Sequence, residues 1–424
     1  MPPERRQRAG WRGVGVVVGA TNKSSSLHVL TVCALSLPGL AIRAGELPDM
    51  EAGFQYSHYQ ESDERMQVEM FHTRGSLALD SGARFSLDWV VDTISGSSPV
   101  LSVPKSCLDS VSGATQVILD SQCEALDKPV NVLSSASIRD TRHQVDLGVE
   151  KELNGDTVKV GIGFSSEKDY RSFYVQASDS RDWQGGMFTL SPQLAYASNR
   201  IQPVGRSLDR SSQSIAADLG FTVTIDRQSL LHLQLGYAHE RGFLSNPYKK
   251  VLVLGGDPRL EFGGFSQAFF ERRPERRNQG MVLLHYVRHV APLDAALHLE
   301  YRFHTDDWEV DAHSFELSWY QPVVGQWQVV PRLRYYSQNQ AGFYRPFFPT
   351  ARKDGHYSSD YRLAGFGSLS GGLSVEKLLW QKCNLHVAFE YYQHRAGLQL
   401  GGSNQSGFAD FSFFLLTAGL QLTF

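Results

Sequence analysis

The sequence predicts an all-β fold, a transmembrane antiparallel up-and-down β-barrel of about 16 strands. Three features of the chain predict it. Segments of roughly 9 to 14 residues, in which apolar and polar residues alternate, follow one another through most of the chain, as in membrane barrels. The connections between these segments are alternately short and long. The last segment ends on an aromatic residue, Phe424.

Residues 1–44 have the layout of a secretory signal peptide. A basic start precedes an uncharged, mostly apolar run over residues 27–42, and the small residues Ala41 and Ala44 offer two cleavage sites. Pro38 disfavours the alternative, a buried helix. The start is longer than a signal peptide needs, which leaves the true start codon open. Residues 45–424 are expected to form a single barrel domain.

The composition excludes two classes of protein. Cleavage after Ala44 leaves 35 Lys and Arg residues against 43 Asp and Glu residues, a net charge of −8, which argues against a nucleic-acid partner. Mean hydropathy is −0.28, too polar for a helical membrane protein. No stretch after residue 42 reaches the roughly 20 apolar residues that a spanning helix needs.

Side chains alternate between the two faces of each expected strand. Phe85, Leu87 and Trp89, for example, lie opposite a face that carries Arg84 and Asp88. The same pattern recurs over residues 158–164, 188–196, 214–225, 231–237, 297–304, 327–335 and 384–391. With Phe54–Tyr59 as the first strand, the count comes to about 16, an even number as bacterial barrels require. Pro192 and Pro331 fall within strands, where we expect local bulges.

The connections predict which end of the barrel faces which side of the membrane. Short turns are expected near residues 80–82, 154–156, 184–185, 226–227, 291–292, 324–325 and 381–382. Longer connections alternate with them, and the longest are 95–139 and 241–277. Outer-membrane barrels have short periplasmic turns and long extracellular loops. Trp183, Trp319, Trp327 and Trp380 fall near the turn ends, as in an interfacial aromatic girdle.

The C-terminal strand resembles the assembly signal of bacterial outer-membrane barrels. Leu416, Ala418, Leu420, Leu422 and Phe424 share one face of this strand. We expect the barrel assembly machinery to read Gly419, Leu422 and Phe424 before the strand closes the barrel. Elsewhere, Cys107 and Cys123 lie in one polar loop and are expected to form a disulfide, while Cys383 shares the apolar face of Leu385 and is expected to face lipid.

Four stretches of the chain resemble a known family. They are residues 92–99 (DTISGSSP), 166–172 (SEKDYRS), 242–249 (GFLSNPYK) and 358–363 (SSDYRL). Together they resemble the bacterial outer-membrane β-barrel family catalogued as domain of unknown function 3570 over nearly all of the mature chain. Ser97 stands where the family usually has alanine. The resemblance implies a barrel, and it implies no activity, substrate or catalytic residue.

Several polar groups could carry chemistry. An Asp-x-Arg pattern recurs at Asp140/Arg142, Asp169/Arg171 and Asp360/Arg362, and these are candidate ion pairs of the outer rim; a ligand or ion site is the alternative. The acidic turn between His304 and His313 could bind a divalent cation, but an exposed turn is the simpler interpretation. No nucleophile motif is present, so we expect no enzyme, no metal and no cofactor.

The expected function is that of a porin-like pore or transport channel for small polar solutes in the bacterial outer membrane. Expected inward-facing residues carry both signs of charge, as in a wet lumen. A barrel that is plugged by its own loop 95–139 or by a partner, and that acts as a scaffold, adhesin or electron-transfer sheath, is the alternative. Outer-membrane lipid and lipopolysaccharide are expected partners. A basic cluster in the long loops could contact lipopolysaccharide or another partner, or it could be a solvated loop face; its members are Arg272, Arg273, Arg276 and Arg277.

Overall fold

The computed structural model describes residues 50–96, 99–105, 108–111, 114–117, 128–133, 138–265, 268–380, 382–402 and 409–424. The expected signal peptide, residues 1–44, and the expected disulfide partners Cys107 and Cys123 lie outside this part of the chain. In the described part, no helix has the length and apolar character needed to cross a membrane.

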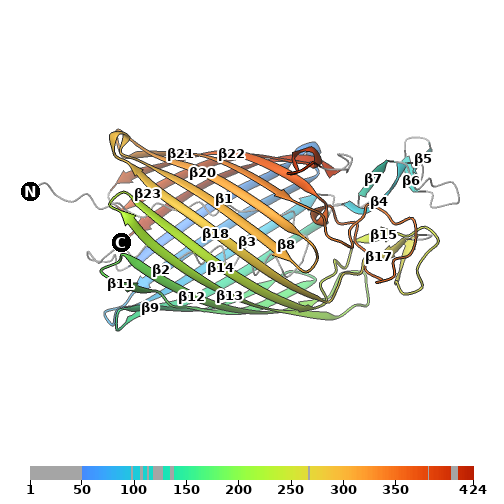
Figure 1. The fold of residues 1–424 in the computed structure, drawn as a ribbon, viewed down its shortest axis with the longest axis horizontal. Coiled ribbons are helices and arrows are strands. Elements are labelled where there is room, and N and C mark those ends of the chain that lie inside the picture. The colour runs from blue at the N-terminus through green and yellow to red at the C-terminus, as the bar shows by residue number, and fades with distance from the viewer. Residues whose placement is uncertain are drawn as a thin grey trace, which may run out of the picture.

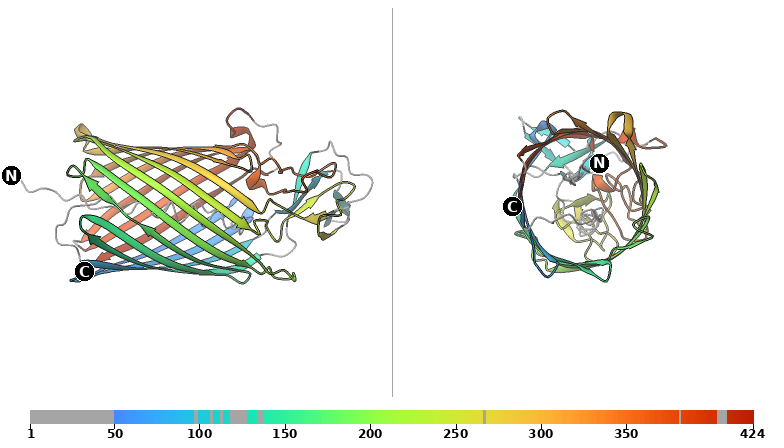
Figure 2. Two further views of the ribbon diagram at one scale, coloured as in Figure 1. Left: turned by 60° about the horizontal axis from the view of Figure 1, so that its bottom comes forward. Right: turned by 90° about the vertical axis from the view of Figure 1, so that its left-hand side faces the viewer.

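The fold is a closed antiparallel β-barrel (Figures 1 and 2). The barrel has 16 strand positions, and we call this closed sheet the wall. Each strand pairs with its neighbours in sequence. The wall strands are β1 (Met50–Glu61), β2 (Met66–Ala78), β3 (Ala83–Gly96), β8 (Ile138–Leu153), β9 (Asp156–Ser166), β10 (Tyr170–Ser178), β11 (Arg181–Trp183), β12 (Phe188–Ile201), β13 (Arg210–Asp226), β14 (Ser229–Gly242), β18 (Arg276–Val290), β19 (Ala295–Asp306), β20 (Asp311–Val323), β21 (Trp327–Gln338), β22 (Phe366–Trp380), β23 (Cys383–Arg395) and β24 (Phe411–Thr423). The short 3-10 turns are η1 (Ser62–Glu64), η3 (Ala291–Leu293), η4 (Tyr361–Leu363) and η5 (Ala396–Leu398).

Two prolines interrupt the ladder of the wall without shifting its register. β10 and β11 are two pieces of one strand position, since both pair with β9 and β12, and Pro192 lies opposite the break between them. The pairing of β20 with β21 is likewise interrupted beside Pro331 and resumes in the same register. The expected bulges are therefore absent at both places, because a proline that lacks an N–H removes one hydrogen bond but adds no residue.

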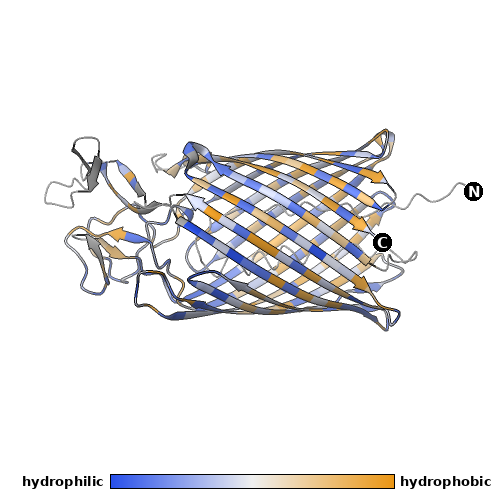
Figure 3. Ribbon diagram, turned by 180° about the vertical axis from the view of Figure 1, so that it is seen from behind, coloured by the Kyte–Doolittle hydropathy of each residue, from blue (hydrophilic) through white to orange (hydrophobic). Residues whose placement is uncertain are grey.

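Hydrophilic and hydrophobic residues alternate along the strands of the wall (Figure 3), and the two faces differ as this alternation predicts. Phe85, Leu87 and Trp89 are 44%, 46% and 47% exposed on the outward face, whereas Asp88 points inward and binds His72 and Arg74. Apolar side chains exposed around a closed sheet indicate a lipid-facing surface. Cys383 departs from the prediction: it is 1% exposed and lies where the register of β22 shifts.

The first and last strands close the barrel. β1 pairs with β24 from Glu51 opposite Thr423 to Glu61 opposite Phe413. The backbone N–H of Phe424 extends this ladder by donating to the carbonyl of Met50 at 2.9 Å. Closure leaves no unpaired strand edge, which a sheet in lipid cannot tolerate.

One end of the barrel carries short turns and the other carries long loops. We call them the turn end and the loop end. In the turn 154–155, Asn154 and Gly155 adopt positive φ values of 54° and 88°, as a two-residue hairpin turn of this kind requires. The C-terminus lies at the turn end (Figure 1). Trp183, Trp327 and Trp380 are also exposed there.

Three loops form a cap at the loop end, made by the described residues of 99–133, 243–273 and 340–364. Its strands form small sheets: β4 (Pro99–Pro104) with β7 (Pro129–Leu133), β5 (Leu108–Val111) with β6 (Ala114–Val117), and β15 (Lys250–Leu252), β16 (Phe262–Phe265) and β17 (Ala268–Phe270). Figure 1 shows these strands beyond the wall, and in the end-on view of Figure 2 the cap lies within the outline of the barrel. The described strands of loop 95–139 therefore lie over the opening rather than inside the lumen.

Candidate functional site

The loop-end opening brings together segments that are far apart in the sequence. The cap has an apolar core of its own: Leu101 and Val103 of β4 pack against Leu252 of β15 and Ala268 of β17. A second cluster joins Val251 and Val253 to Phe348 and Tyr357. A third lies at the base of the cap, and its members are Leu244, Trp308, Val310, Ala341, Phe343, Tyr344, Leu363 and Ala364. Burial of this much apolar surface makes the cap a folded unit rather than three separate loops.

A buried ion network connects the loop 243–273 to the loop 340–364. Arg273 lies 2.7 Å from Glu271 and donates to Asp360 at 2.8 Å, and Arg362 also donates to Asp360. Lys249 is 2% exposed beside the same carboxylates. The hydroxyl of Ser358 donates to Glu271 at 2.6 Å. We call Lys249, Glu271, Arg273, Asp360 and Arg362 the cap network.

The pKa values of two cap-network groups reflect this environment. Burial lowers the pKa of Lys249 to about 8, with Asp360 opposing the change. Burial alone would raise the pKa of Asp360, but Arg362, Lys249 and Arg273 hold it well below its usual range. Removal of one partner would leave a buried charge uncompensated, which typically costs about 3–5 kcal/mol.

A second group of contacts fixes the cap to the wall near the β1–β24 seam. Arg65 lies 2.6 Å from Glu61, and Tyr59 donates to the same carboxylate at 2.6 Å. The guanidinium of Arg65 stands 5.9 Å from the ring of Tyr361 in η4 and 4.8 Å from the ring of Phe411. The cap is thus held by the first hairpin and the last strand as well as by its own core.

Three of the four stretches that resemble the family motifs contact one another at this opening. Asp169 of the second stretch accepts a hydrogen bond from Tyr248 of the third. The third ends at Lys249, whose ammonium lies beside Asp360 of the fourth. Asp92 of the first stretch pairs with Arg142 on the neighbouring strand. Spacing along the sequence did not reveal this convergence, because the four stretches lie on different loops.

The three Asp-x-Arg patterns have different structures. Asp360 and Arg362 form an ion pair. Arg142 instead pairs with Asp92, because these two residues lie directly opposite each other in the β3–β8 register and are closer than residues two apart on one strand. Asp169 is buried while Arg171 is exposed on the outward face with Phe173, so these two side chains point to different sides of the wall.

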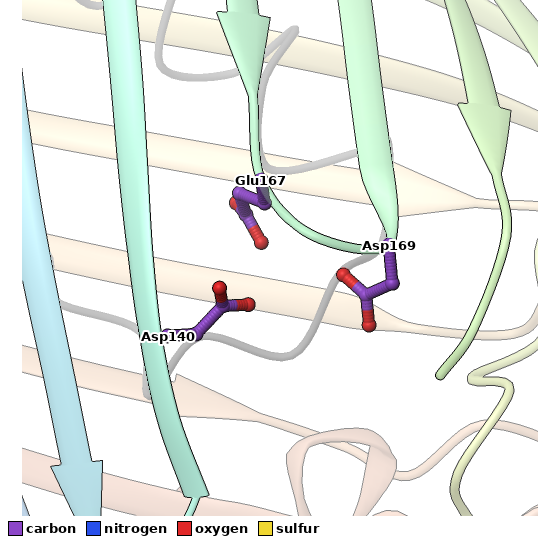
Figure 4. Close-up of side chains that lie close together, drawn as sticks. All are labelled: Asp140, Glu167 and Asp169. Atoms are coloured by element: carbon purple, nitrogen blue, oxygen red, sulfur yellow. The ribbon is translucent and has the colours of Figure 1, made fainter. Parts of the chain in front are cut away.

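Three carboxylates converge at the loop end of β8, β9 and β10 (Figure 4). Asp140, Glu167 and Asp169 each offer an oxygen within 4.8 Å of the others. Oxygen ligands in this number are compatible with a divalent cation such as Ca²⁺. In the described residues no comparable group forms in the turn 304–313: Asp306 pairs with Arg277, and Asp311 accepts from Thr305 at 2.6 Å.

Inside the wall, charged side chains of both signs face the lumen. Arg332 reaches across β22 to Glu390, and Gly372 lies between them in the ladder without a side chain in the way. At other levels, Arg74 binds Asp88 at 2.6 Å and Lys159 lies 2.7 Å from Glu150. The side chains of Arg74 and Lys159 remain 45% and 47% exposed, so water reaches them.

The four arginines of the expected basic cluster lie in four different surroundings. Arg273 is buried in the cap network, and Arg277 is buried against Asp306 with its guanidinium 4.5 Å from the ring of Trp308. Arg272 is exposed on the cap, and Arg276 is exposed at the rim of β18. The four arginines therefore form no single basic patch, and for Arg276 and Arg277 the cause is alternation, which sends successive side chains of β18 to opposite faces.

Comparison with solved structures finds barrels that are remote in sequence. A mutant of the ferric enterobactin receptor PfeA from Pseudomonas aeruginosa matches with a TM-score of 0.41 and 10% identity, over 84% of this chain and 54% of that one. The siderophore receptor PirA from Acinetobacter baumannii matches with a TM-score of 0.41 and 10% identity, over 83% and 54%. A bacterial polysaccharide outer membrane secretin matches with a TM-score of 0.47 and 6% identity, over 89% and 100%. The chain spans about half the length of the two receptors.

A search of curated proteins found no match. The model of a family described as "Protein of unknown function (DUF3570)" matches residues 27–415, which confirms the resemblance of the four sequence stretches. The chain belongs to this family of proteins of unknown function.

Proposed function

We propose that the protein is an outer-membrane channel for small polar solutes, with its turn end in the periplasm and its cap over the extracellular opening. One observation carries the proposal: charged side chains of both signs face the lumen and keep contact with water, as Arg74 and Lys159 do. A barrel that excludes water from its lumen would fill the interior with packed apolar side chains instead. The proposal includes no catalytic role.

Because the lumen carries both signs of charge, we expect the channel to select solutes by their polarity rather than by the sign of their charge. Arg332 and Glu390 balance each other at one level, and Arg302 lies 3.2 Å from Glu300 at another. Balanced pairs leave a small net field, so neither anions nor cations would be strongly excluded. Water-filled barrels of about 16 strands admit small solutes on this basis.

The cap supports a second candidate function, that of a sealed barrel acting as a scaffold, adhesin or electron-transfer sheath. The cap has its own apolar core and a buried ion network, so it is stable in one arrangement over the opening. If this arrangement never opens, the lumen conducts nothing.

Planar-bilayer recording separates the two functions. The purified protein, added at low concentration to a neutral lipid bilayer in 1 M KCl (about 3 Å Debye length), should produce discrete current steps. The matched test for a sealed barrel is the Asp360→Ala variant, in which the cap network is broken. Steps in the wild type support the channel. Steps in the variant alone, or in neither protein, overturn the proposal in favour of the sealed barrel.

A further inference from the structure

We propose that an outward-facing groove at the loop-end rim of β10, β12 and β13 binds the phosphate of a membrane glycolipid, the phosphorylated lipid A portion of lipopolysaccharide. The groove has a volume of about 740 Å³, and its lining includes Phe164, Arg171, Phe173, Arg200 and Arg210. The inference rests on the proposed outer-membrane location and names a lipid partner for the outer surface of the wall.

The groove lies where the lipid-facing surface of the wall gives way to charge. Phe164 and Phe173 lie opposite each other on β9 and β10 and are 49% and 46% exposed on the outward face. One step nearer the loop end, Arg171 of β10 lies directly opposite Arg200 of β12. Aromatic side chains below and cations above are the order of groups that a lipid interface presents from its acyl chains to its headgroups.

The two opposed arginines can hold an anion between them. Like charges directly opposite each other on neighbouring strands destabilise a sheet. Arg200 pairs with Asp209 at 2.6 Å, but both side chains are more than half exposed, so the pair is weak and Arg200 can take a second anion. Arg171 has no ion-pair or hydrogen-bond partner among the described residues. A phosphate placed between the two guanidinium groups would accept paired hydrogen bonds from both.

The positive charge continues along the same rim. Arg241 of β14 lies opposite Gln213 of β13 and binds its side-chain oxygen at 2.7 Å, and Arg276 of β18 lies opposite Arg241. The acids in the groove lining are Asp209 and Glu275, fewer than the arginines of this rim. The outward rim of β20 differs, because it carries Asp311.

Immediately below the groove, the wall offers an apolar surface for acyl chains. Ile162 of β9 and Ile215 of β13 are 46% and 56% exposed, and Leu194 of β12 is 61% exposed. A ligand with a phosphate and several acyl chains can therefore satisfy both surfaces at once, whereas a free phosphate can use only the arginines.

The test measures binding of fluorescent bisphosphorylated lipid A to the purified full-length protein in a non-ionic detergent. We expect the double substitution Arg171→Gln/Arg200→Gln to weaken binding roughly tenfold or more, as the loss of charge-assisted hydrogen bonds predicts. Arg171→Lys/Arg200→Lys should retain most of the affinity. The matched control Arg181→Gln/Arg227→Gln removes the same charge at the turn end and should bind as the wild type does.

Three results would overturn the inference. Equal binding of dephosphorylated lipid A would show that phosphate is not recognised. Displacement of lipid A by millimolar inorganic phosphate would assign the groove to a soluble anion. Unchanged affinity in the double variant would exclude the two arginines. If the double variant does not assemble, the lipid A affinity of the single variant Arg171→Gln tests the inference instead. The Arg171 side chain is exposed and has no ion pair or hydrogen bond among the described residues, so this variant should assemble. None of these readouts involves ion conduction, so failure here is distinct from failure of the channel proposal.

Discussion

The wall and the cap of this protein are stabilised in different ways. In the wall, each strand pairs with its neighbour in the wall, and large apolar side chains are exposed on strands all around the barrel. In the cap, charged side chains from separate loops are buried together, as Arg273 and Asp360 are. The wall therefore tolerates the loss of single side chains, whereas the cap depends on a few residues. We therefore expect variants of the cap network to change the opening of the lumen without changing the closure of the barrel.

The difference also explains which features the sequence predicted. Alternation is a local signal, so the faces of the wall and its 16 strand positions could be predicted, and the structure confirms the fold class. Contacts in the cap join residues far apart in sequence, such as Arg273 and Asp360, and no periodic pattern in the sequence predicts them. The same limit applies to Arg142, since its pairing with Asp92 depends on the strand register and not on the nearby Asp140.

The prediction with the largest expected effect concerns the wall. Deletion of Phe424 should greatly lower the amount of assembled barrel in the outer membrane while changing the melting temperature of the assembled fraction little. Phe424 is 53% exposed and contributes one backbone hydrogen bond to Met50, so its loss removes little packing. Heat-modifiable gel mobility of membrane fractions measures the assembled amount.

Trp308→Ala is the matched control for this deletion. Trp308 is 4% exposed at the base of the cap, and its removal should cost about 3–5 kcal/mol of packing there. Assembly should nevertheless proceed, because the last strand is intact. If the Phe424 deletion assembles at the wild-type level, the C-terminal strand is an ordinary strand.

The second prediction concerns the cap network. Asp360→Ala should destabilise the cap by about 3–5 kcal/mol, since it removes the buried carboxylate that Arg273 and Arg362 share and leaves the buried Arg273 with Glu271 alone. Limited proteolysis should then cut within residues 243–273 and 340–364 while the wall stays intact. Asp354→Ala is the control: Asp354 pairs with Arg352 on the surface, and loss of an exposed pair typically costs only about 0–1 kcal/mol. Equal cleavage of both variants would contradict the role of the network.

The third prediction is a dependence of the cap on pH. The pKa of Asp360 in the folded cap is held below its ordinary value of 3.8, so the folded state binds fewer protons than the unfolded state in that range. The stabilisation is complete above pH 3.8 and is lost as the pH falls below it. Hydrogen exchange in the cap should therefore show lower protection free energies in acid than at neutral pH.

Lys249 should add a second rise in cap stability with pH, this one at alkaline pH. Its pKa is about 8 in the folded cap against 10.5 for an ordinary lysine, so the cap should gain stability as the pH rises between these values. Lys249→Met should remove this alkaline gain and leave the acid loss. Cap protection free energies that are independent of pH over both ranges would contradict the assignment of these two groups.

The smallest expected effect concerns the lumen. Glu390→Gln removes the charged partner of Arg332 on the inner face, where the two side chains are 25% and 16% exposed, so stability should fall less than in Asp360→Ala, whose carboxylate is fully buried. The reversal potential under a KCl gradient should shift toward anion preference. Asp311→Asn, which neutralises an outward-facing acid, should leave the reversal potential unchanged. If the reversal potential shifts equally in both variants, the ions do not pass through the lumen.

We propose that ions pass through the water-filled lumen of the wall and that the cap limits their flow. Single-channel recording of the wild type, Asp360→Ala and Asp354→Ala in one bilayer system tests it most directly. The account predicts discrete steps for all three proteins, with larger or longer openings in Asp360→Ala alone, because only this variant breaks the cap network. Identical step size and open time in all three proteins, or the absence of steps from all of them, would contradict it.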